Sequence, residues 1–131
     1  MLNKTNKGEI KMNEELKKLS EGIIKQIPTG ERNIESSDIF EVDGIKYSYD
    51  EEEELDIEDE GKYQYGGCIY AIGLLDEEKG YGVKGEPLFY MEQDFSRSGS
   101  YFSDYYYDYE EPYVVEKVEK VVTITSWKRI E

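Results

Sequence analysis

Residues 38–49 read DIFEVDGIKYSY, and this stretch determines the fold class. Apolar and polar residues alternate on both sides of Asp43-Gly44, a dipeptide typical of two-residue hairpin turns in which both residues have positive φ. Such a turn places two apolar pairs on one face and one charged pair on the other. The predicted pairs are Val42 with Ile45, Phe40 with Tyr47, and Glu41 with Lys46.

The segment before this hairpin, residues 13–30, predicts an amphipathic helix. Apolar residues recur at spacings of three and four and form a single stripe. Asn13 can cap the start of the helix, and Pro28 with Gly30 can end it. We expect the stripe to cover a sheet, after a flexible leader at residues 1–12. The stripe consists of Met12, Leu16, Leu19, Ile23 and Ile27.

The rest of the chain alternates between acidic and strand-like segments. Residues 50–60 hold nine acids in eleven positions, and their mutual repulsion predicts a solvated acidic loop over 50–61. Residues 62–75 and 86–95 have strand composition, with a bulge or bend expected at Gly66-Gly67. Residues 113–127 fit either a helix face or a strand, and their five valines favour the strand. We expect one α+β domain over 13–131, with the N-terminal amphipathic helix packed on an antiparallel sheet of four to six strands.

The acidity of the chain lies in its middle. The formal net charge is −15; residues 30–113 hold 24 acids against six bases, whereas residues 1–29 and 114–131 have net charges of +2 and +1. Such a field repels nucleic acid and anionic lipid and attracts a basic protein surface. We therefore expect no direct binding of nucleic acid or membrane, and a basic protein as partner.

Several kinds of chemistry are disfavoured by the residues present. Histidine is absent, which removes the commonest general base, and Cys68 lies in an apolar strand that predicts a core thiol. Residues 80–85 spell GxGxxG but lead into a strand rather than a helix, and residues 56–67 lack the final Glu of an EF-hand. Among 31 acids, no pair is marked as a glycosidase pair. We expect a non-enzymatic protein with no cofactor and no metal.

Residues 101–113, YFSDYYYDYEEPY, combine tyrosines with carboxylates and suit protein recognition. Tyrosine gives a large contact at low entropy cost, and carboxylates pair with Lys and Arg. If the stretch is extended, Tyr105, Tyr107 and Tyr109 share one face that can seal the core, and the other face offers charge outward. The latter carries Asp104, Tyr106, Asp108 and Glu110.

Residues 99–112 (GSYFSDYYYDYEEP), Val114-Val115-Glu116 and residues 118–122 (VEKVV) resemble the C-terminal segment of small phage- and prophage-encoded proteins. In those proteins an aromatic Ser/Gly/Tyr/Asp turn leads into a Pro-x-x-Val strand and a late aromatic residue, which Trp127 matches. Size, acidity and the lack of catalytic groups are also similar to acidic phage counter-defence proteins, including DNA mimics and anti-CRISPR proteins. The resemblance implies a counter-defence protein in the bacterial cytoplasm and carries over no functional residue.

Three functions are compatible with these patterns. The first is an inhibitor that mimics nucleic acid and occupies the basic channel of a defence or DNA-processing protein, such as a CRISPR effector or a nuclease. The second is an immunity-type antitoxin of a basic toxin nuclease, and the third is a small carbohydrate- or metal-binding module. The predicted partner-binding residues fall in two runs: Asp104, Tyr105, Tyr106, Tyr107, Asp108, Tyr109, Glu110 and Glu111, then Glu51, Glu52, Glu53, Glu54, Asp56, Glu58, Asp59 and Glu60.

Overall fold

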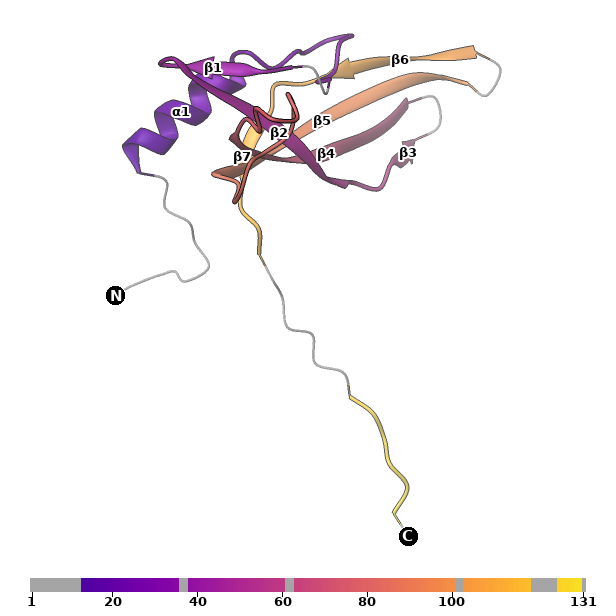
Figure 1. Ribbon diagram of the computed structural model, residues 1–131. Coiled ribbons are helices and arrows are strands. Elements are labelled where there is room, and N and C mark those ends of the chain that lie inside the picture. Colours follow the sequence, from indigo (N-terminus) through magenta and orange to yellow (C-terminus); the bar gives the residue numbers. More distant parts are fainter. Residues whose placement is uncertain (1–12, 36–37, 61–62, 101–102, 119–124, 131) are drawn as a thin grey trace.

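The computed structural model describes residues 13–35, 38–60, 63–100, 103–118 and 125–130. Within this part of the chain, one helix precedes seven strands that form a single antiparallel sheet, which confirms the α+β class (Figure 1). The elements are α1 (Glu14–Ile24), β1 (Phe40–Val42), β2 (Ile45–Glu54), β3 (Glu58–Glu60), β4 (Tyr63–Leu74), β5 (Phe89–Ser100), β6 (Ser103–Tyr109) and β7 (Tyr113–Val115). The expected leader, residues 1–12, lies outside the described residues.

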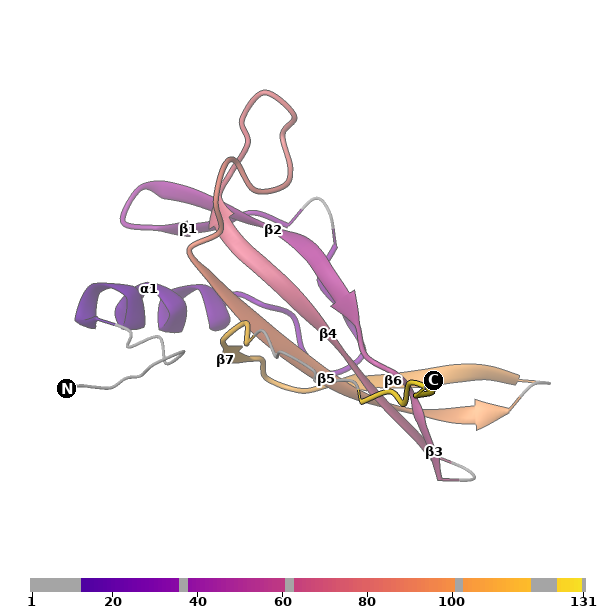
Figure 2. The same ribbon diagram turned by 90° about the horizontal axis from the view of Figure 1, so that it is seen from below.

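The seven strands occupy five positions across the sheet, because two positions are each shared by two strands. The order is β1-β2-β4-β5-β6, with β3 also pairing β4 and β7 also pairing β5. β2 pairs with residues 68–74 of β4 and β3 with residues 63–65; similarly, β6 pairs with residues 95–100 of β5 and β7 with residues 90–92. The sheet twists strongly, and the ends of β3 to β6 project away from α1 (Figure 2).

The predicted hairpin forms with the expected register. β1 and β2 pair Phe40 with Tyr47 and Val42 with Ile45, and both turn residues have positive φ, 53° at Asp43 and 79° at Gly44. The two-residue turn and the alternation of apolar and polar residues on both sides of it therefore agree on one register.

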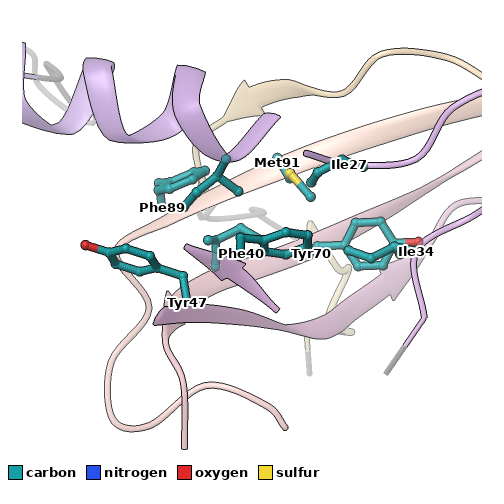
Figure 3. Close-up of a cluster of buried hydrophobic side chains, with 9 residues drawn as sticks. Ile27, Ile34, Phe40, Tyr47, Tyr70, Phe89 and Met91 are labelled. Carbon is teal, nitrogen blue, oxygen red and sulfur yellow. The ribbon is translucent and has the colours of Figure 1, made fainter. Parts of the chain in front are cut away.

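Helix α1 begins as predicted and ends earlier. The Asn13 side chain accepts a hydrogen bond from the Leu16 amide at 2.7 Å, but the helix ends at Ile24 rather than continuing toward Pro28. Ile27 lies beyond the helix and is still buried. The helix and the segment after it cover one face of the sheet, which we call the inner face. The core contains Ile23, Ile27, Ile34, Phe40, Tyr47, Tyr70, Ile72, Phe89 and Met91 (Figure 3).

The acidic run at residues 50–60 is not a loop, and this prediction was wrong. Residues 50–54 complete β2 and residues 58–60 form β3, so only residues 55–57 connect two strands. Both strands pair along β4, which supplies the backbone hydrogen bonds of a regular ladder. The carboxylates of Glu51 to Glu54 are exposed to water, where repulsion between two charges 4 Å apart is only about 1 kcal/mol.

Gly66-Gly67 produces no bulge in β4, whose register with β5 is unbroken from Tyr63 to Ile72. The irregularity lies in the neighbouring strand β2, between Glu51 and Glu53. The glycine at 66 instead allows close packing, because a Cβ there would lie 2.7 Å from the Phe95 ring. An aromatic ring that covers a cross-strand glycine shields the backbone where no side chain exists.

The predictions for residues 80–85 and for residues 113–127 had different outcomes. Residues 80–85 lie in the connection between β4 and β5, as expected for a glycine-rich hairpin connection, where the backbone of Leu75 bridges that of Val83. Of residues 113–127, only Tyr113–Val115 form a strand; residues 116–118 and 125–127 have no regular structure, and residues 119–124 lie outside the described residues.

Gln93 fixes the sheet to two loops. It lies on the inner face of β5 with 1% of its surface exposed. Its Nε2 donates to the carbonyl of Pro28 and to that of Glu110, both at 2.9 Å. Its Oε1 has no hydrogen-bond partner among the described residues. One buried amide thus joins the segment after α1 to the segment after β6.

We expect Gln93→Met to lower the free energy of unfolding by about 1–2 kcal/mol, because two partly buried carbonyls lose their donor. The measurement is urea denaturation. Gln26→Met is the matched control: its Nε2 also bonds two carbonyls, of Gly22 and Glu41, but on an exposed surface where water replaces the lost bonds. Equal losses in the two variants would contradict a structural role for Gln93.

Candidate protein-binding surface

The register of four strands brings residues from distant parts of the sequence into rows. Directly opposite residues in antiparallel pairs point to the same face. One row across β3, β4, β5 and β6 contains Glu58, Tyr65, Ser96 and Asp108. The next row contains, at its backbone positions, Glu60, Tyr63, Ser98 and Tyr106. Because residues alternate along each strand, both rows fall on the outer face, opposite the core residues of β4 and β5.

These rows form an exposed tyrosine patch with acidic edges. Tyr106 is 75% exposed, Tyr63 49% and Tyr65 42%. Glu58 and Asp108 lie at the two edges of the row that contains Tyr65, and both are exposed. We call Tyr63, Tyr65, Tyr106, Glu58 and Asp108 the outer tyrosine face.

No basic side chain interrupts this patch within the described residues of β3 to β6. Arg97 is the one Lys or Arg in these four strands, and its cross-strand pairing with Tyr107 places it on the inner face. The outer tyrosine face therefore combines exposed aromatic rings with charged groups that are all acidic.

Arg97 is held on the inner face by an aromatic cluster. Its guanidinium carbon lies 4.3 Å from the ring centre of Tyr105, and its nitrogens donate to the Tyr107 hydroxyl at 3.0 Å and to Gln64 Oε1 at 2.6 Å. The Tyr107 and Tyr109 rings stack at 5.7 Å. Phe95 lies 5.5 Å from the ring of Tyr107 and 5.4 Å from that of Tyr109. We call Phe95, Arg97, Tyr105, Tyr107 and Tyr109 the inner aromatic cluster.

The predicted facing of residues 105–109 agrees with this arrangement, but the predicted role of the inner tyrosines was incomplete. Tyr107 and Tyr109 share one face and Tyr106 and Asp108 share the other, as the β5–β6 register shows, and the contact of Tyr105 with Arg97 places it with Tyr107 and Tyr109. However, none of the three inner tyrosines belongs to the main core. The core ends short of this part of the hairpin, and Arg97 and Phe95 are their partners instead.

The predicted acidic residues do not form a single surface. β4 and β5 separate Glu51 to Glu54 from β6. Glu52 pairs with Lys117 at 3.3 Å, Glu53 is opposite Ile69 on the outer face, and Glu51 and Glu54 are on the inner face beside Cys68. Asp56, Glu110 and Glu111 are exposed in connecting segments, and the side chains of Asp59, Glu60 and Asp104 lie outside the described structure.

Glu51, Glu54 and Cys68 are the group that could hold a metal ion among the described residues, since their ligand atoms lie within 4.8 Å of one another. The irregularity in β2 turns both carboxylates toward Cys68. Burial raises the pKa of the Cys68 thiol, with the negative charges of Glu51 and Glu54 adding to the shift and a hydrogen bond with Tyr70 opposing it. The thiol is therefore mainly protonated at neutral pH, and a metal ion that bound there would have to displace its proton.

Two further carboxylates on the outer face share a tyrosine. The Tyr113 hydroxyl lies 2.6 Å from Glu92 Oε2 and 2.9 Å from Asp94 Oδ2. A hydrogen bond with Asp94 raises the pKa of Glu92, burial raises it further, and the bond from Tyr113 opposes the shift. The bond to Glu92 raises the pKa of Tyr113, which stays neutral. Glu92 thus keeps its proton to a higher pH than an ordinary Glu does.

Sequence reasoning missed Tyr63 and Tyr65. The alternation in KYQY, residues 62–65, places two tyrosines on one face of a strand, which was readable. Their position beside Tyr106 depends on the β4–β5 and β5–β6 registers, which join segments about forty residues apart.

A family model, that of the phage T4 Y04K protein, matches residues 9–130. The chain belongs to this family. The phage part of the resemblance seen in residues 99–122 is thereby confirmed, and the counter-defence part stays a prediction. A search of curated proteins and a search of solved structures found no match. Among the described residues, no helix is both long enough and apolar enough to cross a membrane.

The Glu92–Asp94 pair predicts a specific pH dependence. Because the folded pKa of Glu92 is raised, the folded state holds its proton more tightly than the unfolded state. The contribution to stability is complete below about pH 4.3, the ordinary pKa of Glu, and is lost as the pH rises through the raised folded value. Glu92→Gln, which imitates the protonated form, should stabilise the protein at pH 7 and flatten this decline, as thermal melting at a series of pH values would show.

Glu86→Gln is the control for that experiment, since Glu86 is exposed and its substitution removes the same charge. It should leave the pH profile close to that of the unmodified protein. Identical profiles for the two variants would contradict a raised pKa at Glu92.

Proposed function

We propose that this protein of the phage T4 Y04K family is a non-enzymatic inhibitor. It binds the basic, nucleic-acid-binding surface of a bacterial defence or DNA-processing protein and mimics nucleic acid there. The observation that carries the proposal is the outer tyrosine face, where tyrosines from two strands lie between carboxylates and where no Lys or Arg of the described residues of β3 to β6 points.

The residue types on this face suit a basic groove. Exposed tyrosine rings are rigid anchors that can stack on the planar guanidinium of Arg, and carboxylates beside them accept charge-assisted hydrogen bonds from Lys and Arg. A groove that contacts phosphates and stacks bases uses the same donors and planar surfaces. The outer tyrosine face therefore offers the anionic and planar groups that such a groove binds.

The spacing of the charges also supports mimicry. Glu58 and Asp108 are separated by three strand positions, which corresponds to about 14 Å at a strand spacing of about 4.8 Å. The major groove of B-DNA is about 12 Å wide, so two acidic edges with a tyrosine and serine strip between them have dimensions similar to a DNA groove with its phosphates.

The remaining acidic residues attract a basic partner over a longer range. Residues 30–113 carry 24 acids and six bases, and the exposed carboxylates of β2 lie at the opposite side of β4 and β5 from β6. Such a field accelerates the approach of a positively charged partner and weakens as salt screens it. The protein would act in the cytoplasm of the phage's host, where such partners reside.

The test is capture of a partner from host lysate, followed by measurement of its affinity with purified proteins. The triple variant Glu58→Lys, Asp108→Lys, Tyr106→Ala should weaken binding at least about 30-fold, since one anchoring tyrosine alone accounts for about 2 kcal/mol or more. The control is Glu77→Lys, Glu78→Lys, Tyr81→Ala in the β4–β5 connection, which makes the same charge change and also removes an exposed tyrosine.

Competition decides whether the partner's nucleic-acid site is involved. The partner's affinity for its DNA or RNA should fall when this protein is bound, and binding should weaken steeply between about 0.1 M and about 0.5 M salt. A partner that binds nucleic acid equally well in the complex would rule out mimicry. The identity of the partner separates a defence or DNA-processing protein from a toxin nuclease, for which the protein would be an immunity factor.

A further inference from the structure

A groove with an apolar floor and acidic edges lies on the outer face, between the end of β2 and β7, away from the outer tyrosine face. Its volume is about 430 Å3, within the range of sites that hold small ligands. The floor is formed by Leu55, Ile69, Tyr90 and Val115. Carboxylates of Glu52, Glu53 and Glu92 lie around it.

The groove already binds one cation of its own chain. Lys117 Nζ lies 3.3 Å from Glu52 Oε2 and 6.0 Å from the centre of the Tyr90 ring. The combination of a carboxylate and an aromatic face is a general binding site for Lys and Arg side chains. A ligand with both cationic and apolar groups therefore matches this groove.

The chain carries a segment with those groups. Residues 125–130 read TSWKRI, and they lie well away from the sheet (Figure 1). Trp127 and Ile130 are each 95% exposed, the largest exposed fractions among the hydrophobic residues described. Lys128 and Arg129 lie between them in sequence. Two large apolar side chains and two cations are thus presented to solvent with no covering surface of their own chain.

We propose that the groove binds residues 127–130 of a second copy of this chain. The side chains of Trp127 and Ile130 cover the floor, and Lys128 and Arg129 lie at the acidic edge of the groove, where Glu53 pairs with them. Since each copy has both a groove and a segment, reciprocal exchange closes a symmetric dimer.

The distribution of charge favours binding of residues 127–130 in the groove over direct contact between the sheets of two copies. Each copy carries a net charge of −15, so two sheets brought face to face repel each other. The exposed segment belongs to the region of net positive charge, residues 114–131, and extends from the sheet, so it reaches an acidic groove while the two bodies stay apart. Salt of about 0.15 M screens the remaining repulsion beyond about 8 Å.

The experiment uses analytical ultracentrifugation together with tryptophan fluorescence, because Trp127 is the single tryptophan of the chain. The unmodified protein should dimerise as its concentration rises, and its emission should shift to shorter wavelength in parallel. Trp127→Ala should raise the dimer dissociation constant more than about tenfold, as loss of a buried tryptophan anchor does. Tyr81→Ala, which removes an exposed aromatic residue elsewhere, should leave it unchanged.

Charge reversal tests the groove itself. Glu53→Lys should also raise the dissociation constant, even though it reduces the net repulsion between copies. Glu77→Lys makes the same change in net charge in the β4–β5 connection and should not weaken the dimer. A mixture of Trp127→Ala and Glu53→Lys proteins should form heterodimers, because one copy supplies an intact groove and the other an intact segment.

Four results would overturn the proposal. The first is an unmodified protein that stays monomeric at every concentration with Trp127 exposed to solvent, and the second is a monomer whose emission lies at short wavelength whatever the concentration. The third is a dimer that survives Trp127→Ala or Glu53→Lys. The fourth is a mixture of these two variants that stays monomeric. The second result would show that the segment binds its own chain. None of these results bears on the outer tyrosine face, which lies elsewhere on the sheet.

Discussion

The pairing of β4 with β5 is the interaction on which the rest of the structure depends. Ten consecutive residue pairs, from Tyr63–Ser98 to Ile72–Phe89, join the two strands without a break. β2 and β3 pair along one edge of this ladder and β6 and β7 along the other. Its register therefore determines which side chains of these six strands share a face. A slip of one residue would exchange the core face with the outer face.

The ladder is longer than the core that covers it, and this difference separates the inner face into two parts. Near α1, the side chains of Tyr70, Ile72, Phe89 and Met91 are buried under the helix and the segment after it. Farther along, no helix of the described residues covers the strands, and Phe95 packs over Gly66 while Arg97 lies against Tyr105. Strands that project beyond the core need an apolar face or a packing partner of their own for stability. The inner aromatic cluster supplies local burial where the core is absent, and it leaves the outer face free to carry exposed tyrosines and acids.

The acidic strands show how a high charge density is compatible with regular structure. The acidic half of β2 pairs with β4 along its whole length, apart from the irregularity near Glu52. That irregularity divides the acidic side chains between the two faces of the sheet. Glu51 and Glu54 face inward beside Cys68, whereas Glu53 faces outward beside the groove. The acidic run looks uniform in the sequence, but its side chains lie in three different environments. The third is that of Glu52, which pairs with Lys117.

Local interactions made part of this structure readable from the sequence. The hairpin at 40–47 follows from Asp43-Gly44, because this dipeptide favours a two-residue turn in which both residues have positive φ and whose twist matches that of the paired strands. The start of α1 follows from the Asn13 cap and the spacing of Leu16, Leu19 and Ile23. The alternation in residues 105–109 gave the facing of these side chains, because neighbouring residues of a strand point to opposite faces.

What the sequence could not supply was long-range register. Whether residues 50–60 pair with β4, and whether Tyr63 and Tyr65 lie beside Tyr106, depend on backbone hydrogen bonds between distant segments. These bonds are chemically alike in every register, so composition does not select among them; the packing of one continuous ladder against one small core does.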